Sequence, residues 1–331
     1  MLPAPPLVLT LDDPACAARA ETGGKAAHLA QLAAAGFPVP AGFAVTTHAY
    51  AAFLAAAGGL GADLLARAAA LAGAAPAALE DEAEALRALV ERAPVPGDVT
   101  AAVAQALGAL AGHPAHGGPS PAGVRVAVRS SGTAEDLHGA SFAGMHDTFL
   151  DVPGDLASVL AAVRRCWASL WTGRALAYRR DRGFDHRDAR IAVLVQRMVD
   201  AEAAGVLFTA NPLTRSRDEL VVNASWGLGE AVVSGEVTPD EWVVRRAGLA
   251  VARFALGEKE VRLGPGGALD DVPDELRAVP CLADAHVAEL CALALRVEET
   301  RGGRPQDIEW ALAGGRLHLL QARDVTGAGF D

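Results

Sequence analysis

The sequence DIEWALAGGRLHLLQAR, residues 307–323, consists of two β-prone runs joined by a pair of glycines. This pattern predicts a β-hairpin. If the loop has three residues, Glu309 lies opposite Leu319, whereas a two-residue Gly-Gly turn shifts the register by one and sends Glu309 to the other face. With the three-residue loop, side-chain alternation collects four polar residues on one face of the hairpin. These residues are Asp307, Glu309, Gln321 and Arg323.

This polar face has the chemistry of a magnesium and phosphate site. Mg²⁺ prefers hard oxygen ligands and bound phosphates, so Glu309 and Gln321 are candidate metal ligands. The guanidinium of Arg323 suits bidentate binding of a phosphate. In an isolated hairpin the same face would be no more than a solvated surface. The choice between the two interpretations therefore depends on other segments of the sequence.

The composition excludes several classes of protein. A chain of 331 residues can bury a substantial core and is expected to form two lobes. Its net charge of −11 argues against general nucleic-acid binding. The alanine-rich run at 55–79 contains Asp63, Arg67 and several glycines, so it indicates surface helices and no membrane span.

Cellular location is inferred from the first residues and from the cysteines. The start, Met1 to Pro6, lacks the basic and apolar regions of a signal peptide. The four cysteines show no CxxC spacing, which favours buried, inert thiols over zinc ligands or disulfides. We therefore expect a cytoplasmic protein.

The order of predicted elements indicates an α+β fold. Helices are expected at 24–35, 47–57, 61–72, 77–92, 98–110 and 282–301, with two more within 155–182. Strands are expected around 124–128, 148–152, 191–195, 204–209, 220–225, 241–245 and 250–256. The first half is mostly helical and the second mostly β, so the predicted division is a first lobe at 1–190, a second at 191–326 and a tail at 327–331.

Three further segments suggest a polyphosphate site. Gly23-Gly24 lead into a predicted helix whose start favours an anion, and Lys25 follows them. Only two of the 29 basic residues, Lys25 and Lys259, are lysine. Arg129 ends a predicted strand, where it suits a phosphate or a carboxylate equally. A glycine-containing loop follows at 139–144. Each signal is weak alone, since Gly-Gly-Lys lacks the frame of a P-loop.

Together and in this order, these segments resemble the ATP-binding domain of the phosphoenolpyruvate synthase and pyruvate phosphate dikinase family, which includes rifamycin phosphotransferases. The resemblance spans nearly the whole chain. It is carried by Gly23-Gly24-Lys25-Ala26, Gly36-Phe37-Pro38-Val39-Pro40, Val128-Arg129-Ser130-Ser131, Glu135-Asp136, Ser141-Phe142-Ala143-Gly144, Gln196-Arg197-Met198-Val199, Gly205-Val206-Leu207-Phe208-Thr209, Asn223-Ala224-Ser225-Trp226-Gly227-Leu228-Gly229-Glu230, Pro239-Asp240, Asp307-Ile308-Glu309-Trp310 and Gln321-Ala322-Arg323.

The resemblance implies an ATP-grasp-like fold of two lobes, with ATP and Mg²⁺ bound in the cleft between them. It implies catalytic roles for Lys25, Arg129 and Arg323, and metal binding by Glu309 and Gln321. The implied nucleotide contacts are Lys25, Arg129, Gly139, Ser141, Gly144, Thr148, Gln196, Met198, Val199, Glu309, Gln321 and Arg323. From their residue types alone, Met198 and Val199 are as typical of a core as of an adenine site. The resemblance leaves the role of Lys259 open.

Members of this family transfer a phosphoryl group from ATP to a histidine on a separate swivelling domain, giving AMP and phosphate. An acceptor such as pyruvate or a rifamycin then takes the group. None of the nine histidines here fits the family's histidine motif, and the roles of His138 and His146 stay open. The expected partners are therefore a histidine domain, an acceptor-binding domain and a small-molecule acceptor, without nucleic acid or membrane. The alternatives are a non-catalytic nucleotide-binding regulatory subunit and an ATP-grasp ligase that forms an acyl-phosphate.

Overall fold

The computed structural model describes residues 4–56, 58–71, 73–112, 123–133 and 147–325, which combine helices and sheets in the predicted α+β manner. The chain divides into two compact units. Unit 1 comprises Met1–Ala34 and Ala41–Met198, and unit 2 comprises Ala35–Pro40 and Val199–Asp331. The predicted division between the two lobes lies at residue 190. The strand at 191–197 instead pairs within unit 1, and the short segment at 35–40 belongs to unit 2.

Unit 1 is built on a five-stranded antiparallel sheet in the order β1-β2-β5-β3-β4. Its strands are β1 (Val8–Thr10), β2 (Gly42–Val45), β3 (Arg125–Gly132), β4 (Thr148–Pro153) and β5 (Ile191–Arg197). Its α-helices are α1 (Arg19–Ala34), α2 (Thr47–Ala56), α3 (Leu60–Ala70), α4 (Pro76–Arg92), α5 (Gly97–Gly112), α6 (Leu156–Ala168) and α7 (Gly173–Arg182). The predicted helices match these within a few residues, but strand β1 was not expected.

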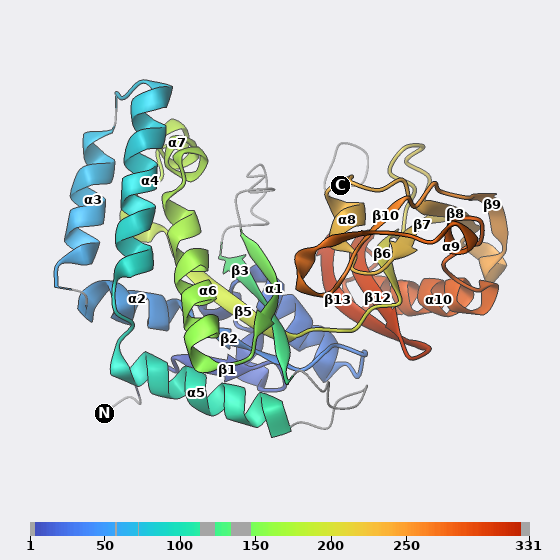
Figure 1. Ribbon diagram of the computed structural model, residues 1–331, viewed down its shortest axis with the longest axis horizontal. Helices are drawn as coiled ribbons and strands as arrows, with labels where there is room; N and C mark the ends of the chain where they lie inside the picture. Colours follow the sequence, from blue (N-terminus) through green and yellow to red (C-terminus); the bar gives the residue numbers. More distant parts are fainter. Residues whose placement is uncertain (1–3, 57, 72, 113–122, 134–146, 326–331) are drawn as a thin grey trace. The chain divides into compact units, whose positions relative to one another are not determined.

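Helices cover both faces of this sheet (Figure 1). Alternate residues of β3 and β5, such as Val128 and Val193, join the core formed with α2 to α7, whose centre includes Phe53 and Trp167. Helix α1 packs against β2, β3 and β5. Because both faces are covered, Ile191 to Val195 are fully buried, which confirms the prediction of a strand without polar alternation.

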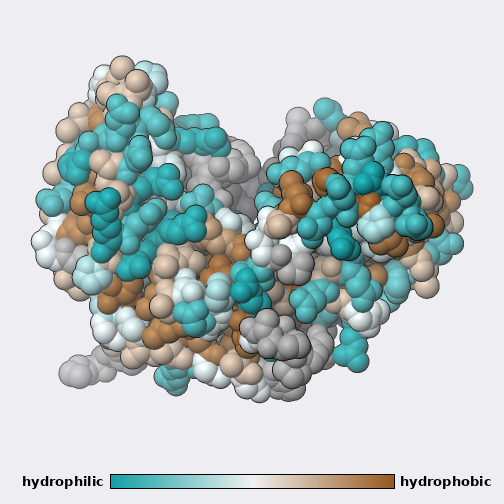
Figure 2. All heavy atoms as spheres, viewed as in Figure 1, coloured by the Kyte–Doolittle hydropathy of each residue, from teal (hydrophilic) through white to brown (hydrophobic). Residues whose placement is uncertain are grey.

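The alanine-rich helices expose hydrophilic side chains, as the charged residues in their sequence predicted. In the view of Figure 2, hydrophilic side chains gather over the part of unit 1 that contains α4. No single described helix is long and apolar enough to cross a membrane. Helices α2 and α3 pass such a test only as a bent pair, and their apolar side chains, including Tyr50, Phe53 and Leu64, are buried in the core.

Unit 2 is built on a six-stranded antiparallel sheet in the order β13-β12-β6-β7-β8-β9 (Figure 1). These strands are β6 (Ala203–Phe208), β7 (Glu219–Trp226), β8 (Asp240–Arg245), β9 (Val251–Ala255), β12 (Gln306–Ala313) and β13 (Arg316–Asp324). A second sheet pairs β10 (Val261–Leu263) with β11 (Leu269–Asp271), and the helices are α8 (Glu230–Val233), α9 (Asp274–Arg277) and α10 (Asp284–Thr300). Alternate strand residues such as Ile308 and Trp310 are fully buried, as are Leu290 and Ala294 of α10.

The segment at 35–40 is attached to unit 2 by two contacts. The backbone N–H of Leu319 donates to the carbonyl oxygen of Pro38 at 2.9 Å. The guanidinium of Arg296 lies 5.0 Å from the centre of the Phe37 ring. The Phe-Pro-Val-Pro turn that follows α1 is therefore packed against β13 and α10.

The four cysteines are buried and free, as predicted. Burial raises the pKa of Cys16 to about 12, and it raises the pKa of Cys291 to a similar value. Since the thiolate is the reactive form, these thiols are inert near neutral pH.

Lys259 forms a fully buried ion pair in unit 2. Its ammonium nitrogen lies 2.5 Å from a carboxylate oxygen of Asp240, and both side chains have no exposed surface. The same carboxylate accepts hydrogen bonds from the backbone N–H groups of Gly257 and Cys281, each at 2.8 Å. The pair therefore ties three chain segments together, and Lys259 has a structural role that the sequence did not indicate.

Replacing Lys259 by Met is expected to reduce the free energy of unfolding by about 3–5 kcal/mol, because it leaves the Asp240 carboxylate buried without a counter-ion. The matched control is Arg304→Met in the same unit, whose partner is Asp324 and whose side chain is 70% exposed. That change should cost less than about 1 kcal/mol. Urea denaturation of both variants measures the difference. Equal losses would contradict a structural role for the buried pair.

Candidate functional site

The hairpin of β12 and β13 places Glu309 directly opposite Gln321. Gly314 and Gly315 form a two-residue turn, and both have positive φ angles of 56° and 68°, which is typical of a type I′ hairpin. The predicted three-residue loop, with Glu309 opposite Leu319, is therefore wrong. A two-residue turn alone would have sent Glu309 to the other face. A β-bulge between the Glu309 and Trp310 positions inserts Leu320 between the two residues that face them and restores the polar grouping.

Asp307 lies next to this pair and faces Arg323 across the strands. The guanidinium of Arg323 donates to the Asp307 carboxylate at 2.8 Å, with a second nitrogen at 2.7 Å. The Asp307 side chain is 11% exposed and that of Arg323 49%. Burial raises the pKa of Asp307 above its usual value, and the charge of Arg323 opposes this shift. Asp307 thus fixes the direction of Arg323, a role that the sequence analysis did not assign.

The same face of the sheet carries further polar residues on β7 and β8. Glu309 pairs with Val206, Val206 with Asn223, and Asn223 with Glu241. Residues in direct cross-strand register point to the same face of a sheet. The face that carries Asp307, Glu309, Gln321 and Arg323, here called the polar face, therefore also carries Asn223 and Glu241.

In unit 1 the start of α1 lies against the end of β3. The regular helix begins after Gly23, whose φ of 74° and ψ of 174° break the helical turn. The backbone N–H of Ala26 donates to the Ser131 hydroxyl at 3.3 Å. A Cβ atom on Gly23 would lie 2.0 Å from the backbone oxygen of Ser131. Glycine at this position thus lets the turn that carries Lys25 approach the strand that carries Arg129.

Arg129, Thr148 and Gln196 share one face of the unit 1 sheet. Arg129 pairs with Thr148 on β4 and with Leu194 on β5. Gln196 lies two residues beyond Leu194, so it is a diagonal neighbour of Arg129. Arg129 is 8% exposed and Gln196 2%. The structure therefore gathers three of the predicted nucleotide contacts, and it brings the segment of Lys25 to the same strand end.

Met198 and Val199 lie where the chain passes from unit 1 to unit 2. The backbone N–H of Met198 already donates to the carbonyl oxygen of Arg125 at 2.9 Å, and the carbonyl oxygen of Val199 accepts from Ala201 at 2.8 Å. Gly139, Ser141 and Gly144, together with His138 and His146, lie outside the described residues.

The family model for the pyruvate phosphate dikinase AMP/ATP-binding domain matches residues 19–330. The chain belongs to this family. Relatives of the chain are named rifampicin phosphotransferase and phosphoenolpyruvate synthase. The predicted resemblance is confirmed, and the chain is an AMP/ATP-binding domain of this type.

Three relatives illustrate the similarity. The chain is 44% identical to a rifampicin phosphotransferase of Streptomyces sp. over 97% of the chain and 36% of the relative. It is 40% identical to a probable phosphoenolpyruvate synthase of Methanocaldococcus jannaschii over 92% of the chain and 25% of the relative. It is 37% identical to a phosphoenolpyruvate synthase of Pyrococcus furiosus over 92% of the chain and 42% of the relative. The chain thus spans between a quarter and about two-fifths of these relatives.

Two residues of the candidate site could not be assigned a role from the sequence. Asp307 was placed on the polar face without a role, although its spacing of two from Glu309 on a strand was a usable signal. Ser131 stands two residues after Arg129 and follows the same alternation. Its contact with Ala26 joins positions 105 residues apart, so local sequence patterns could not reveal it.

Replacing Gly23 by Ala is expected to weaken ATP binding at least tenfold and to lower stability, because the new Cβ would displace Ser131 and the start of α1. Gly36→Ala is the matched control, since Gly36 has a similar φ of 77° but no atom within 4 Å of the added Cβ. The control should show only the cost of left-handed backbone, about 1–2 kcal/mol, with normal ATP affinity. Calorimetric titration with ATP measures the affinities. Equal effects of the two variants would refute the close-approach argument.

Asp307→Asn is expected to change the pH dependence of stability and to lower the rate of phosphoryl transfer. The raised pKa means that folding disfavours the ionised carboxylate, so the native protein loses stability as pH rises from about 4 through that pKa. The Asn variant escapes this loss, and its unfolding free energy relative to wild type should increase between pH 4 and pH 7. Its phosphoryl transfer should fall, because Arg323 loses its orienting partner. Urea denaturation at both pH values checks the first statement. The opposite pH trend would contradict it.

Proposed function

We propose that this chain binds Mg-ATP in an ATP-grasp-like arrangement and transfers a phosphoryl group to a histidine on a separate domain or chain. In this proposal ATP and water yield AMP and phosphate while the histidine takes one phosphoryl group, and the phosphohistidine passes that group to an acceptor such as pyruvate or a rifamycin. Unit 1 supplies phosphate contacts and unit 2 supplies the metal ligands. The observation that carries the proposal is the pairing of Glu309 with Gln321 beside an Arg323 that Asp307 holds in place.

The polar face fits a magnesium ion that is shared with a nucleotide. Among the described residues, no three His, Cys, Asp or Glu side chains are grouped to bind a metal ion by themselves. One carboxylate and one amide oxygen are therefore the ligands available at Glu309 and Gln321, and phosphate oxygens would complete the set. This incomplete protein shell is typical of Mg²⁺ at nucleotide sites. When bound, the ion neutralises charge on the phosphates.

The cations have separate tasks in the proposed reaction. Phosphoryl transfer requires positioning and charge neutralisation more than covalent help from the protein. Arg129, which is nearly buried, and Lys25 at the start of α1 hold the phosphates, with Thr148 and Gln196 beside Arg129. Arg323 projects from a fixed ion pair toward the charge that develops during transfer. An orienting carboxylate matters here because preorganised charges stabilise a transition state without reorganising.

The histidine has to come from outside this sequence. None of its nine histidines lies in the family's phosphohistidine motif. The relatives extend well beyond the matched region, which covers 36% of the Streptomyces protein. We call the rest of that protein the Streptomyces remainder. We propose that a corresponding domain or chain supplies the histidine and binds the acceptor.

The direct test incubates the chain with Mg-ATP and the Streptomyces remainder. We expect AMP together with a phosphoprotein that survives heating and is labile to acid, as phosphohistidine is. Binding of ATP without transfer to any partner would favour a regulatory subunit. Release of ADP with an acyl-phosphate product would favour a ligase. Failure to bind ATP at all would contradict every version of the proposal.

Arg323→Ala and Glu309→Ala are each expected to lower the transfer rate by about 10²–10³, since removal of one preorganised charge partner raises the barrier by about 3–4 kcal/mol. The control is Arg316→Ala, an exposed arginine at the turn end of the same strand, which should leave the rate unchanged. Circular dichroism confirms folding, and rapid-quench assays measure the rate. A loss in the control equal to that in Arg323→Ala would point to a general charge effect.

A further inference from the structure

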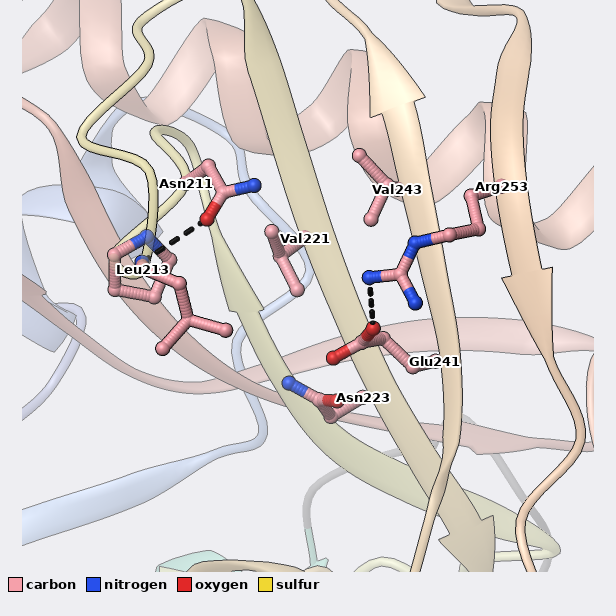
Figure 3. A pocket seen from close by; sticks show the side chains of 8 residues that line it. Asn211, Leu213, Val221, Asn223, Glu241, Val243 and Arg253 are labelled. Atoms are coloured by element: carbon pink, nitrogen blue, oxygen red, sulfur yellow. Dashed lines mark hydrogen bonds and ion pairs between the residues drawn. The ribbon is translucent and has the colours of Figure 1, made fainter.

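A small pocket opens on the polar face of unit 2, at the strands far from β13 (Figure 3). It encloses about 220 Å³. Its apolar wall is formed by Val221, Val243 and Pro212, and Asn223 and Arg253 lie at its polar side. The ion pair of Arg253 with Glu241, at 2.6 Å, spans β9 and β8 along this side. We call this cavity the Asn211 pocket, after the residue that organises its rim.

The rim of the pocket is a well-anchored loop at 209–218. The side-chain oxygen of Asn211 accepts from the backbone N–H groups of Leu213 at 3.0 Å and Thr214 at 3.1 Å. Its side-chain nitrogen donates to Glu219 at 2.8 Å. Arg246 holds both ends of the loop, because it donates to the carbonyl oxygens of Thr209 and Arg217 at 2.7 Å.

This anchored loop presents an apolar side chain to solvent. Leu213 is 84% exposed, the largest value among the large hydrophobic residues that the structure exposes in its described part. A single exposed leucine needs no explanation by itself. Here, however, the leucine stands on a hydrogen-bonded loop and borders a pocket with an apolar wall. At protein–protein interfaces the residues that contribute most to binding cluster in desolvated pockets near the centre.

The size of the pocket favours a protein side chain over a free ligand. Pockets that bind small molecules usually enclose about 300–1,000 Å³ and bury most of the ligand. A volume of 220 Å³ on the open face of a sheet is below that range. It is sufficient for one apolar side chain. Within the described residues, the Asn223 side chain makes no hydrogen bond, so its amide can bind the backbone of an incoming segment.

The pocket lies on the same face of the sheet as the residues proposed to hold the phosphoryl group. Asn223 and Glu241 belong to the same cross-strand row as Glu309, and Val221, Val243 and Arg253 belong to the row of Asp307 and Arg323. A domain that takes a phosphoryl group held at Glu309 and Arg323 has to approach this face of the sheet. Such a domain would reach the pocket within the same contact.

We propose that the Asn211 pocket and Leu213 are the docking point for the separate histidine-bearing domain, which inserts an apolar side chain beside Leu213. This inference rests on the proposed function, and it specifies where on unit 2 the partner binds. The interaction acts on recognition of the partner and leaves ATP binding to the residues described above.

The test compares Leu213→Asp with wild type in phosphoryl transfer to the Streptomyces remainder at increasing concentrations of that partner. We expect KM for the partner to rise about tenfold or more, equivalent to about 1.4 kcal/mol of lost binding, with kcat and the Kd for ATP unchanged. Leu269→Asp is the control, since Leu269 is 52% exposed in the same unit and does not line the pocket. It should leave KM unchanged.

A second variant, Val243→Ala, enlarges the pocket without adding charge and should also raise KM for the partner. Unchanged KM in both pocket variants would overturn the docking inference while leaving the proposed function intact. Absence of transfer by the wild-type chain would instead overturn the proposed function. Sedimentation of wild type and of Leu213→Asp tests whether two copies of the chain associate through the pocket. Loss of a dimer in the variant with normal transfer would show that a second copy occupies the pocket, which also overturns the inference.

Discussion

The register between β12 and β13 is the constraint on which the candidate site depends. In a strand, a slip of one residue exchanges the two faces, so a carboxylate at 309 and an amide at 321 meet only in one register. The hairpin achieves this register with a tight Gly314-Gly315 turn and a β-bulge that inserts Leu320. The same register places Trp310 on the buried face. Core packing and the positions of the two candidate metal ligands are therefore fixed together, and neither can shift without the other.

The candidate residues of each unit are positioned by a different kind of interaction. In unit 2 the interaction is a charge pair, since Asp307 stays bound to Arg323 although burial raises the pKa of its carboxyl. In unit 1 the constraint is steric, since glycine at position 23 allows the turn before Lys25 to approach the end of β3. Lys259 marks the limit of reasoning from residue type. Lys25 and Lys259 both follow glycine-containing turns in the sequence, yet Lys259 forms a buried structural ion pair.

Much of the fold could be predicted from the sequence. The alanine-rich helices and the apolar strand at 191–195 follow their patterns within a few residues, because burial and periodicity coincide there. Three-residue strands such as β1 and β10 carry too few side chains for a pattern, whether the partner is distant, as for β1, or nearby, as for β10. The bulge at Leu320 has no local signature either. The prediction that Glu309 and Gln321 share a face was correct although its loop was not, because the turn and the bulge offset one another.

The central claim is that Glu309 and Gln321 bind one ion together. A double-mutant cycle with Glu309→Ala, Gln321→Ala and the double variant, measured as the Kd for Mn²⁺ with bound ATP by electron paramagnetic resonance, tests it most directly. Joint binding predicts that either change removes most of the affinity, so that the second costs much less than the first, with a coupling above about 1 kcal/mol. Additive effects within about 0.5 kcal/mol would contradict the claim.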